Sequence, residues 1–189
     1  MLLWRFLEDL VFSTSEGFDI LHLKGCDITN KVGEPQLPVK LVQVVLPAGS
    51  EVEEVVVTSA EGEFLPDRYH IFPVQPPRIL SFMQQSIPLV QPDPKIYQQG
   101  IEYPGKLVKY SGTGFLGGYQ LANVLIYPVQ YVPAENKVKL YSHIQFRIRY
   151  SPGKKQPLPI KRRSQINKQI YEKILKEATL NPHQIKPDF

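Results

Sequence analysis

The chain has 189 residues and a single cysteine, Cys26, which excludes an internal disulfide and any metal site built from several cysteines. A chain of this length can bury a hydrophobic core without such support. The charge is uneven: nine Lys/Arg face three Asp/Glu from Ser151 to Phe189, against 13 and 15 in the residues before. The basic character therefore belongs to the tail, which argues against nucleic-acid binding by the whole chain.

The first twelve residues, MLLWRFLEDLVF, do not have the pattern of a signal peptide. They contain Arg5, Glu8 and Asp9, and no small-residue cleavage site follows them. The segment is also too short and too charged to span a membrane. Either it is a strand that pairs into the domain, or a true signal lies upstream of it.

Residues 18–150 consist of short apolar runs separated by proline and glycine, which is typical of β-strands. In the clearest run Ile144, Phe146, Ile148 and Tyr150 alternate with polar residues, as in a strand with one buried face. Other strands are expected at 18–23, 39–46, 52–57, 121–129 and 138–141, with a turn at 133–136 and a meander over 121–150. Because no helical period occurs among them, the strands indicate an antiparallel sandwich or barrel. Of the two, we predict an all-β, antiparallel, jelly-roll-like β-sandwich domain over residues 1–150.

Two segments of this domain are predicted as loops. Residues 73–94 are rich in proline and cannot form a central strand, so they predict a long loop of the kind that carries function. Gly112–Gly118 is predicted as a second, glycine-rich loop. It does not fit a phosphate-binding loop, because no Lys-Ser/Thr pair follows it.

After the sandwich, residues 151–163 have the composition of a basic Pro/Gly linker, and residues 164–189 are expected to form a helical tail. Ser164 is a candidate helix N-cap, and Pro182 is expected to stop the helix. An apolar residue recurs every fourth position, at Ile166, Ile170, Ile174 and Ala178. Such a narrow stripe predicts a helix that needs a surface on which to dock.

No catalytic or metal site is predicted in this chain. Cys26 and one of His22, His70, His143 and His183 could form a nucleophile and base, but KGCDITN is no recognisable nucleophile turn and the histidines lack zinc spacing. A structural role for Cys26 is the better interpretation, and no cofactor is expected. The tyrosines and Phe115 would suit a carbohydrate-binding surface, although tyrosine is also favoured in strands generally.

The basic triplet Lys161-Arg162-Arg163 allows three interpretations. It is a solvated charge run in a linker, a nucleic-acid contact without the interleaved aromatics that such contacts favour, or a site where a protease with basic specificity cuts.

Three segments in the same order carry a family resemblance. They are GEPQLPVKLVQVVLPAGSEVEEVVV (33–57), IYQQGIEYPGKLVKY (96–110), and residues 117–150 with Gly-Gly-Tyr and NVLIYPVQYVPAENKVKLYSHIQFRIRY. Together they resemble the propeptides of gingipain-type cysteine peptidases. The tail, with Ile170-Tyr171-Glu172-Lys173, resembles the segment that connects such a propeptide to its peptidase.

The resemblance implies a secreted or cell-surface, non-catalytic module. Such a module covers the active-site face of the catalytic domain in the same polypeptide, keeps it latent, assists its folding and is removed by cleavage. Cutting at the linker or the basic triplet is then expected to release the inhibitor. The alternative is a carbohydrate- or surface-binding sandwich.

The resemblance also implies an inhibitory loop. In the family a basic residue on a protruding loop enters the specificity pocket. Aligned on Tyr103, that loop falls on the proline-rich segment, with Arg78, Ile79, Leu80, Ser81, Phe82, Met83, Gln84 and Gln85 as the peptidase-contacting residues. The family's basic position falls near Phe82 or Met83. Either Arg78 fills the pocket from a shifted register, or the cognate peptidase does not prefer basic side chains.

Overall fold

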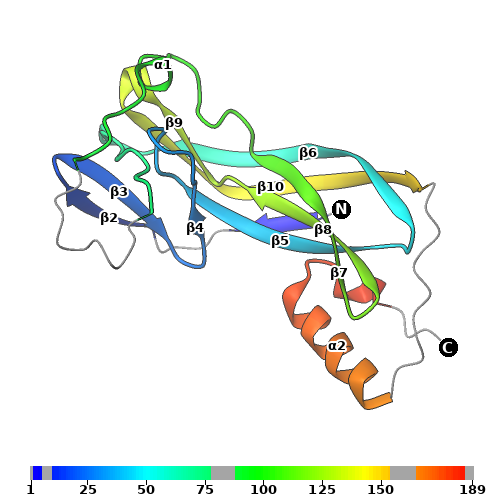
Figure 1. The fold of residues 1–189 in the computed structure, drawn as a ribbon. Coiled ribbons are helices and arrows are strands. Elements are labelled where there is room, and N and C mark those ends of the chain that lie inside the picture. Colours follow the sequence, from blue (N-terminus) through cyan, green and yellow to red (C-terminus); the bar gives the residue numbers. More distant parts are fainter. Residues whose placement is uncertain (1, 6–9, 78–87, 154–164, 186–189) are drawn as a thin grey trace.

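The computed structural model describes residues 2–5, 10–77, 88–153 and 165–185, and its strands form two antiparallel sheets and a separate hairpin (Figure 1). The first sheet contains β1 (Leu2–Arg5), β10 (Lys137–Pro152) and β6 (Ser50–Phe64), with β9 (Val129–Val132) also paired to β10. The second has the order β4 (Asp27–Ile28), β5 (Pro38–Leu46), β8 (Tyr119–Ile126), β7 (Val108–Leu116). The hairpin joins β2 (Leu10–Ser15) and β3 (Phe18–Leu23).

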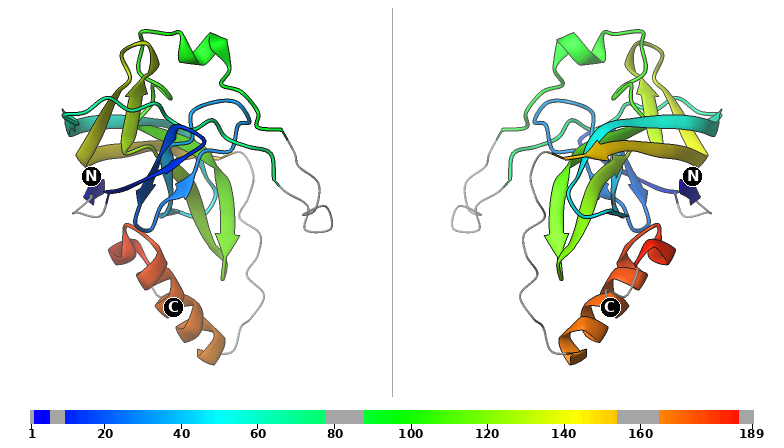
Figure 2. Two further views of the ribbon diagram at one scale, coloured as in Figure 1. Left: turned by 90° about the vertical axis from the view of Figure 1, so that its left-hand side faces the viewer. Right: turned by 90° about the vertical axis from the view of Figure 1, so that its right-hand side faces the viewer.

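The helical elements are short and peripheral. They are α1 (Pro94–Tyr97), α2 (Gln165–Ala178) and the 3-10 turns η2 (Pro133–Glu135) and η3 (Pro182–Gln184). Helices α1 and α2 lie at opposite ends of the molecule (Figure 2). No helix in the described residues has the length and apolar character needed to cross a membrane.

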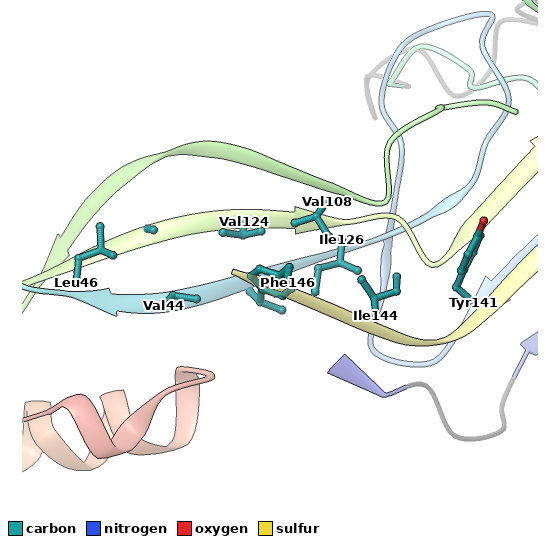
Figure 3. Packing of buried hydrophobic residues seen from close by; sticks show 10 residues of the cluster. Val44, Leu46, Val108, Val124, Ile126, Tyr141, Ile144 and Phe146 are labelled. Carbon is teal, nitrogen blue, oxygen red and sulfur yellow. The ribbon is translucent and has the colours of Figure 1, made fainter. Parts of the chain in front are cut away.

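The two sheets pack face to face around one hydrophobic core. Val44, Val124 and Ile126 of the second sheet meet Ile144 and Phe146 of β10, and all five are almost completely buried (Figure 3). The alternation along residues 144–150 follows the prediction at its buried positions, while Tyr150 is 45% exposed at the end of the strand. The predicted all-β antiparallel sandwich is therefore confirmed.

A second core lies under the β2–β3 hairpin. Leu21, Leu37, Ile71, Tyr131 and Val138 come from five separate segments of the chain, and each is completely buried. Ile71 belongs to this core, and the proline-rich segment begins two residues later. The core therefore fixes the start of that segment and positions the candidate site described below.

The predicted meander over residues 121–150 is wrong. Strand β8 belongs to the second sheet, whereas β9 and β10 belong to the first. The chain crosses between the sheets at Tyr127-Pro128, where the Tyr127 N–H donates to Leu107 O and Pro128 O accepts from the Tyr141 N–H. The expected strands at 138–141 and 143–150 are one continuous strand, β10, because the long strand β6 pairs along both of them. Sequence patterns do not reveal such long-range partners.

The prediction of a loop over Gly112–Gly118 is also wrong for most of its length. Strand β7 continues through Leu116 against β8, with an irregularity between Tyr110 and Gly112, and only Gly117 and Gly118 form the turn. The partner strand supplies a hydrogen-bond ladder that outweighs the low strand preference of glycine. Near the N-terminus, β1 pairs with β10, in agreement with the interpretation of that segment as a strand.

Helix α2 docks through a different face from the one predicted. Ile170 and Ile174 are 51% and 43% exposed, while Leu175 is completely buried against β5 and β8. The side chain of Ile166 and the proposed cap Ser164 lie outside the described residues. The helix ends at Ala178, before Pro182 begins η3. The helix does have a surface on which to dock, as expected. The shape of that surface, formed by β5 and β8, determines which face of the helix is buried.

Candidate functional site: the base of the proline-rich loop

The predicted inhibitory residues Arg78–Gln85 and the triplet Lys161–Arg163 lie outside the described residues. The two legs that carry the loop are described, as residues 71–77 and 88–93. They meet at a structure that we call the loop base, formed by Gly33, Glu34, Gln75, Val90 and Asp93. The geometry of the loop base is therefore the observable part of the candidate site.

The first leg is held as an added strand segment. The Val74 N–H donates to Glu34 O and the Gly33 N–H donates to Val74 O, both at 2.9 Å. One residue pair further on, the Gln36 N–H donates to Phe72 O at 2.9 Å. Pro73 fits here because its neighbours carry the hydrogen bonds and it has no N–H to satisfy. The leg is thus fixed up to the residue before Gln75.

The second leg is held by the same glycine. The Asp93 N–H donates to Gly33 O at 2.9 Å, so the N–H and the C=O of Gly33 bind one leg each. Gly33 has a φ of +83°, a left-handed conformation that residues with a side chain rarely adopt. A glycine at the start of the Gly-x-Pro-x-Leu-Pro segment therefore has a physical role, since it joins both legs at one point.

A side-chain amide then ties the two legs to each other. Gln75 Oε1 accepts from the Val90 N–H at 2.9 Å, and Gln75 Nε2 donates to Val90 O at 3.1 Å. The same Nε2 also donates to Pro73 O at 2.9 Å. The amide thereby replaces one rung of a β-ladder between segments that are 15 residues apart. Sequence reasoning missed Gln75, because nothing local to it indicates its partner.

Helix α1 closes the second leg against the body of the domain. Asp93 caps it, with Oδ1 accepting from the Lys95 N–H at 2.9 Å, and Pro94 occupies the first turn. The Tyr97 hydroxyl donates to Ile71 O, at the start of the first leg, at 2.8 Å. Burial raises the pKa of Tyr97, so the phenol remains a hydrogen-bond donor at neutral and moderately alkaline pH.

A tyrosine–carboxylate contact supports the loop base from below. The Tyr103 hydroxyl donates to Glu34 Oε2 at 2.5 Å. Burial, and then this hydrogen bond, raise the pKa of Tyr103 above its usual range. Tyr103 also exchanges both backbone hydrogen bonds with Tyr131, whose pKa burial raises to about 12. The Tyr-Pro-Gly step therefore connects the loop base to β9.

A buried glutamine completes this support. Gln130 is 1% exposed, and its Oε1 accepts from the Gly105 N–H at 2.9 Å. Its Nε2 lies 3.3 Å from Lys106 O and 3.4 Å from Tyr127 O. All three segments that carry the family resemblance thus converge here: Gly33 from the first, Tyr103 from the second and Gln130 from the third.

Cys26 does not have the surroundings of a catalytic thiol. It is half-buried, and burial raises its pKa to about 11, partly offset by Lys40. The thiol is therefore protonated at neutral pH, whereas a nucleophilic cysteine needs a lowered pKa. His22 contacts Ser13 and His143 contacts Glu61. Among the described residues no three His, Cys, Asp or Glu side chains gather as a metal site.

Comparisons with known proteins identify the family. The Propeptide_C25 family model matches residues 11–185. The structure of the complex of the pro- and mature domains of RgpB from Porphyromonas gingivalis is similar, with a TM-score of 0.72 and 19% identity over 96% of this chain and 91% of that chain. A structure described as giving insight into the zymogenic latency of gingipain K from the same organism has a TM-score of 0.66 and 22% identity. The match covers 80% of this chain and 86% of that chain. No curated protein sequence matches the chain.

The family match covers the sandwich except β1, the loop legs and the tail as far as η3. The two structural likenesses extend over the same all-β architecture. The chain therefore belongs to the Propeptide_C25 family, the propeptides of gingipain-type cysteine peptidases.

Proposed function

We propose that this chain is a non-catalytic propeptide that keeps the catalytic domain of its own cysteine peptidase latent and assists its folding. In this proposal residues 78–85 contact the active-site cleft. The observation that carries it is the loop base, where Gly33 and Gln75 each bind both legs of the proline-rich segment.

The physical argument concerns entropy. A loop whose legs are already joined loses less conformational freedom when it enters a cleft, so more of its contact energy appears as affinity. The covalent link to the peptidase adds a high effective concentration, so that modest contacts suffice for latency. The same loop in the free chain should therefore inhibit more weakly than in the tethered zymogen.

The structural relatives support a peptidase partner. One is described as a complex of pro- and mature domains, and the other concerns zymogenic latency. Because gingipain-type peptidases are secreted or cell-surface enzymes, we place this chain on the same route. The triplet Lys161–Arg163 is our candidate processing site for a peptidase with basic specificity.

The direct test is titration of the purified chain into the catalytic domain encoded with it, with fluorogenic substrates that differ in the residue before the cut. We expect saturable inhibition that weakens strongly when residues 78–85 are replaced by Gly/Ser, since the legs and the loop base remain intact. Unchanged inhibition by the Gly/Ser variant would contradict the role of the loop.

The residue that enters the pocket is tested by two variants. If Arg78 fills it, Arg78→Ala weakens inhibition and the best substrate has a basic residue, while the exposed Arg68→Ala serves as the control for loss of a positive charge. If instead Phe82 or Met83 does so, Arg78→Ala has no larger effect than Arg68→Ala, and the best substrate is not basic.

The alternative function, carbohydrate or surface binding, would need exposed aromatic side chains gathered on one face of the described sandwich. The exposed aromatics Phe12, Phe64, Phe115 and Tyr150 lie on four different strands, β2, β6, β7 and β10. Tyr97, Tyr103 and Tyr131 instead pack at the second core. Absence of inhibition at micromolar chain would make this alternative the leading one.

A further inference from the structure

We infer that the free edge of β5 is a peptide-binding site for the chain's own C-terminal segment, residues 171–185, which we call the docked tail. A cut within residues 154–164 would then yield two fragments that stay associated, so nicking there would not by itself separate the sandwich from whatever follows the tail. This inference does not depend on the inhibitory role proposed above, because it concerns how two parts of one chain bind each other.

The backbone contacts are those of an added strand. Strand β4 pairs with β5 only at Pro38 and Val39, which leaves the rest of that edge open. There Gln43 forms a parallel bridge with Thr179, and the Leu180 N–H donates to Gln43 O at 3.0 Å. Peptides that bind a sheet edge do so through such main-chain hydrogen bonds.

A buried asparagine continues the pairing. Asn181 Oδ1 accepts from the Val45 N–H at 2.8 Å, and its Nδ2 donates to Val45 O at 2.9 Å. Gln184 Oε1 accepts a further bond from the same Nδ2 at 2.7 Å. Asn181 is 2% exposed, so in the docked state its amide and the Val45 backbone depend on each other, and not on water, for these hydrogen bonds. This requirement gives the site its specificity.

Apolar side chains flank the asparagine on both sides. Leu175 is completely buried and Ile185 is 7% exposed, and they form one cluster with Val45 of β5 and Leu121 of β8. The docked tail thus packs a leucine and an isoleucine against β5 and β8, in a cluster separate from the core between the sheets, with an amide between them. A peptide that binds a sheet edge has these two features: main-chain hydrogen bonds to the strand, and apolar side chains that pack beside it.

The turn between β7 and β8 is shaped to receive the tail. A Cβ built on Gly117 would lie 2.7 Å from Cβ of Tyr171, too close for any side chain. Gly117 also has a φ of +58°, which favours glycine. The turn and the helix therefore fit closely where Gly117 meets Tyr171.

The contacts that hold the docked tail join the sandwich to residues after the linker, so a cut in the linker breaks none of them. Such a cut removes only the effective concentration that the tether provides. The family match also continues across the linker to residue 185. The docked tail is therefore a part of the propeptide, and the triplet Lys161–Arg163 lies inside the propeptide and not at its boundary.

The test uses the full chain with the recognition sequence of a specific protease placed within residues 154–164. After complete cutting, we expect the two fragments to co-elute in size-exclusion chromatography at micromolar concentration and to appear as one complex in native mass spectrometry. Separation of the wild-type fragments, with the uncut chain folded, would overturn the inference.

The specificity of the site is tested by exchange, which leaves the sandwich unmodified. A fluorescent peptide of residues 165–185 should enter the cut complex and displace the resident tail. The same peptide with Asn181→Ala should bind at least about tenfold more weakly, because Val45 then loses both partners. A peptide with Ile174→Ala is the matched control, since Ile174 is 43% exposed. Equal binding of the Asn181→Ala and wild-type peptides would refute the proposed site.

Discussion

The loop base, next to α1, and the contact of the docked tail with β5, next to α2, use the same kind of side-chain hydrogen bonding in different surroundings. The two helices lie at opposite ends of the molecule (Figure 2). In each, one side-chain amide binds the N–H and the C=O of a single valine: Gln75 with Val90, and Asn181 with Val45. Gln75 is half-buried among prolines, whereas Asn181 is buried and flanked by Leu175 and Ile185.

The difference in burial changes what each amide contributes. A buried valine backbone that loses its amide partner cannot form replacement hydrogen bonds with water, whereas a partly exposed one can. We therefore expect the Asn181 contact to determine stability and the Gln75 contact to determine mainly the arrangement of the loop legs.

Truncating the apolar anchor of the tail should have the largest effect. Leu175→Ala is expected to lower the free energy of unfolding by about 2–5 kcal/mol, because it removes a completely buried side chain and leaves a cavity. The neighbouring Ile174→Ala should cost less than about 0.5 kcal/mol. Urea unfolding followed by circular dichroism measures both, and similar losses would show that α2 does not dock through Leu175.

Asn181→Ala should cost about 1–3 kcal/mol in the same measurement, since it leaves the backbone groups of Val45 without partners in a buried place. Hydrogen exchange of the Val45 amide should become faster than that of Val44, which faces β8 in the sheet. An unchanged urea midpoint for Asn181→Ala would indicate that water replaces the hydrogen bonds of the amide.

Alkaline pH should destabilise the loop-base end of the molecule. The pKa values of Tyr97, Tyr103 and Tyr131 are raised in the folded state, with burial as the first cause. Above about pH 10 the unfolded chain therefore binds fewer protons than the folded one, and stability falls by up to about 1.4 kcal/mol per pH unit for each tyrosine. Below that pH their contribution is fully present.

The pH effect can be assigned with one variant. Tyr103→Phe should reduce the dependence of stability on pH between about 10 and 12, because one group that resists ionisation is gone. Thermal unfolding at several pH values measures this slope. An identical slope in the variant would mean that Tyr103 ionises in the folded protein as readily as in the unfolded one.

Gln75→Ala should have the smallest effect on stability, about 1 kcal/mol or less, because its contacts are partly exposed. Under the proposed function it should nevertheless weaken inhibition of the cognate peptidase by about tenfold, since the legs are no longer tied. Gln91→Ala is the control, because Gln91 is exposed and its amide contacts only Leu89 O, at 3.5 Å. Equal inhibition by both variants would remove Gln75 from the mechanism.

Local patterns along the chain were enough to predict the class of the fold and the family. Period-two alternation marked residues 144–150 as a half-buried strand, and prolines excluded residues 73–94 from a sheet centre, because both signals depend on neighbours along the chain. The resemblance segments likewise identified the propeptide family, and the family match over residues 11–185 confirmed it.

Long-range packing selects which strands share a sheet, which face of α2 is buried and where the side-chain amides bind. Val45 and Asn181 are 136 residues apart, and Gln75 and Val90 are 15 apart, so no local pattern relates them. The regular stripe of Ile170 and Ile174 indicated the wrong face, because the surface that accepts the helix is shaped by β5, β8 and Gly117. Local composition sets what each segment can form, and the distant partner then selects which of those possibilities has its polar groups satisfied and its apolar groups buried.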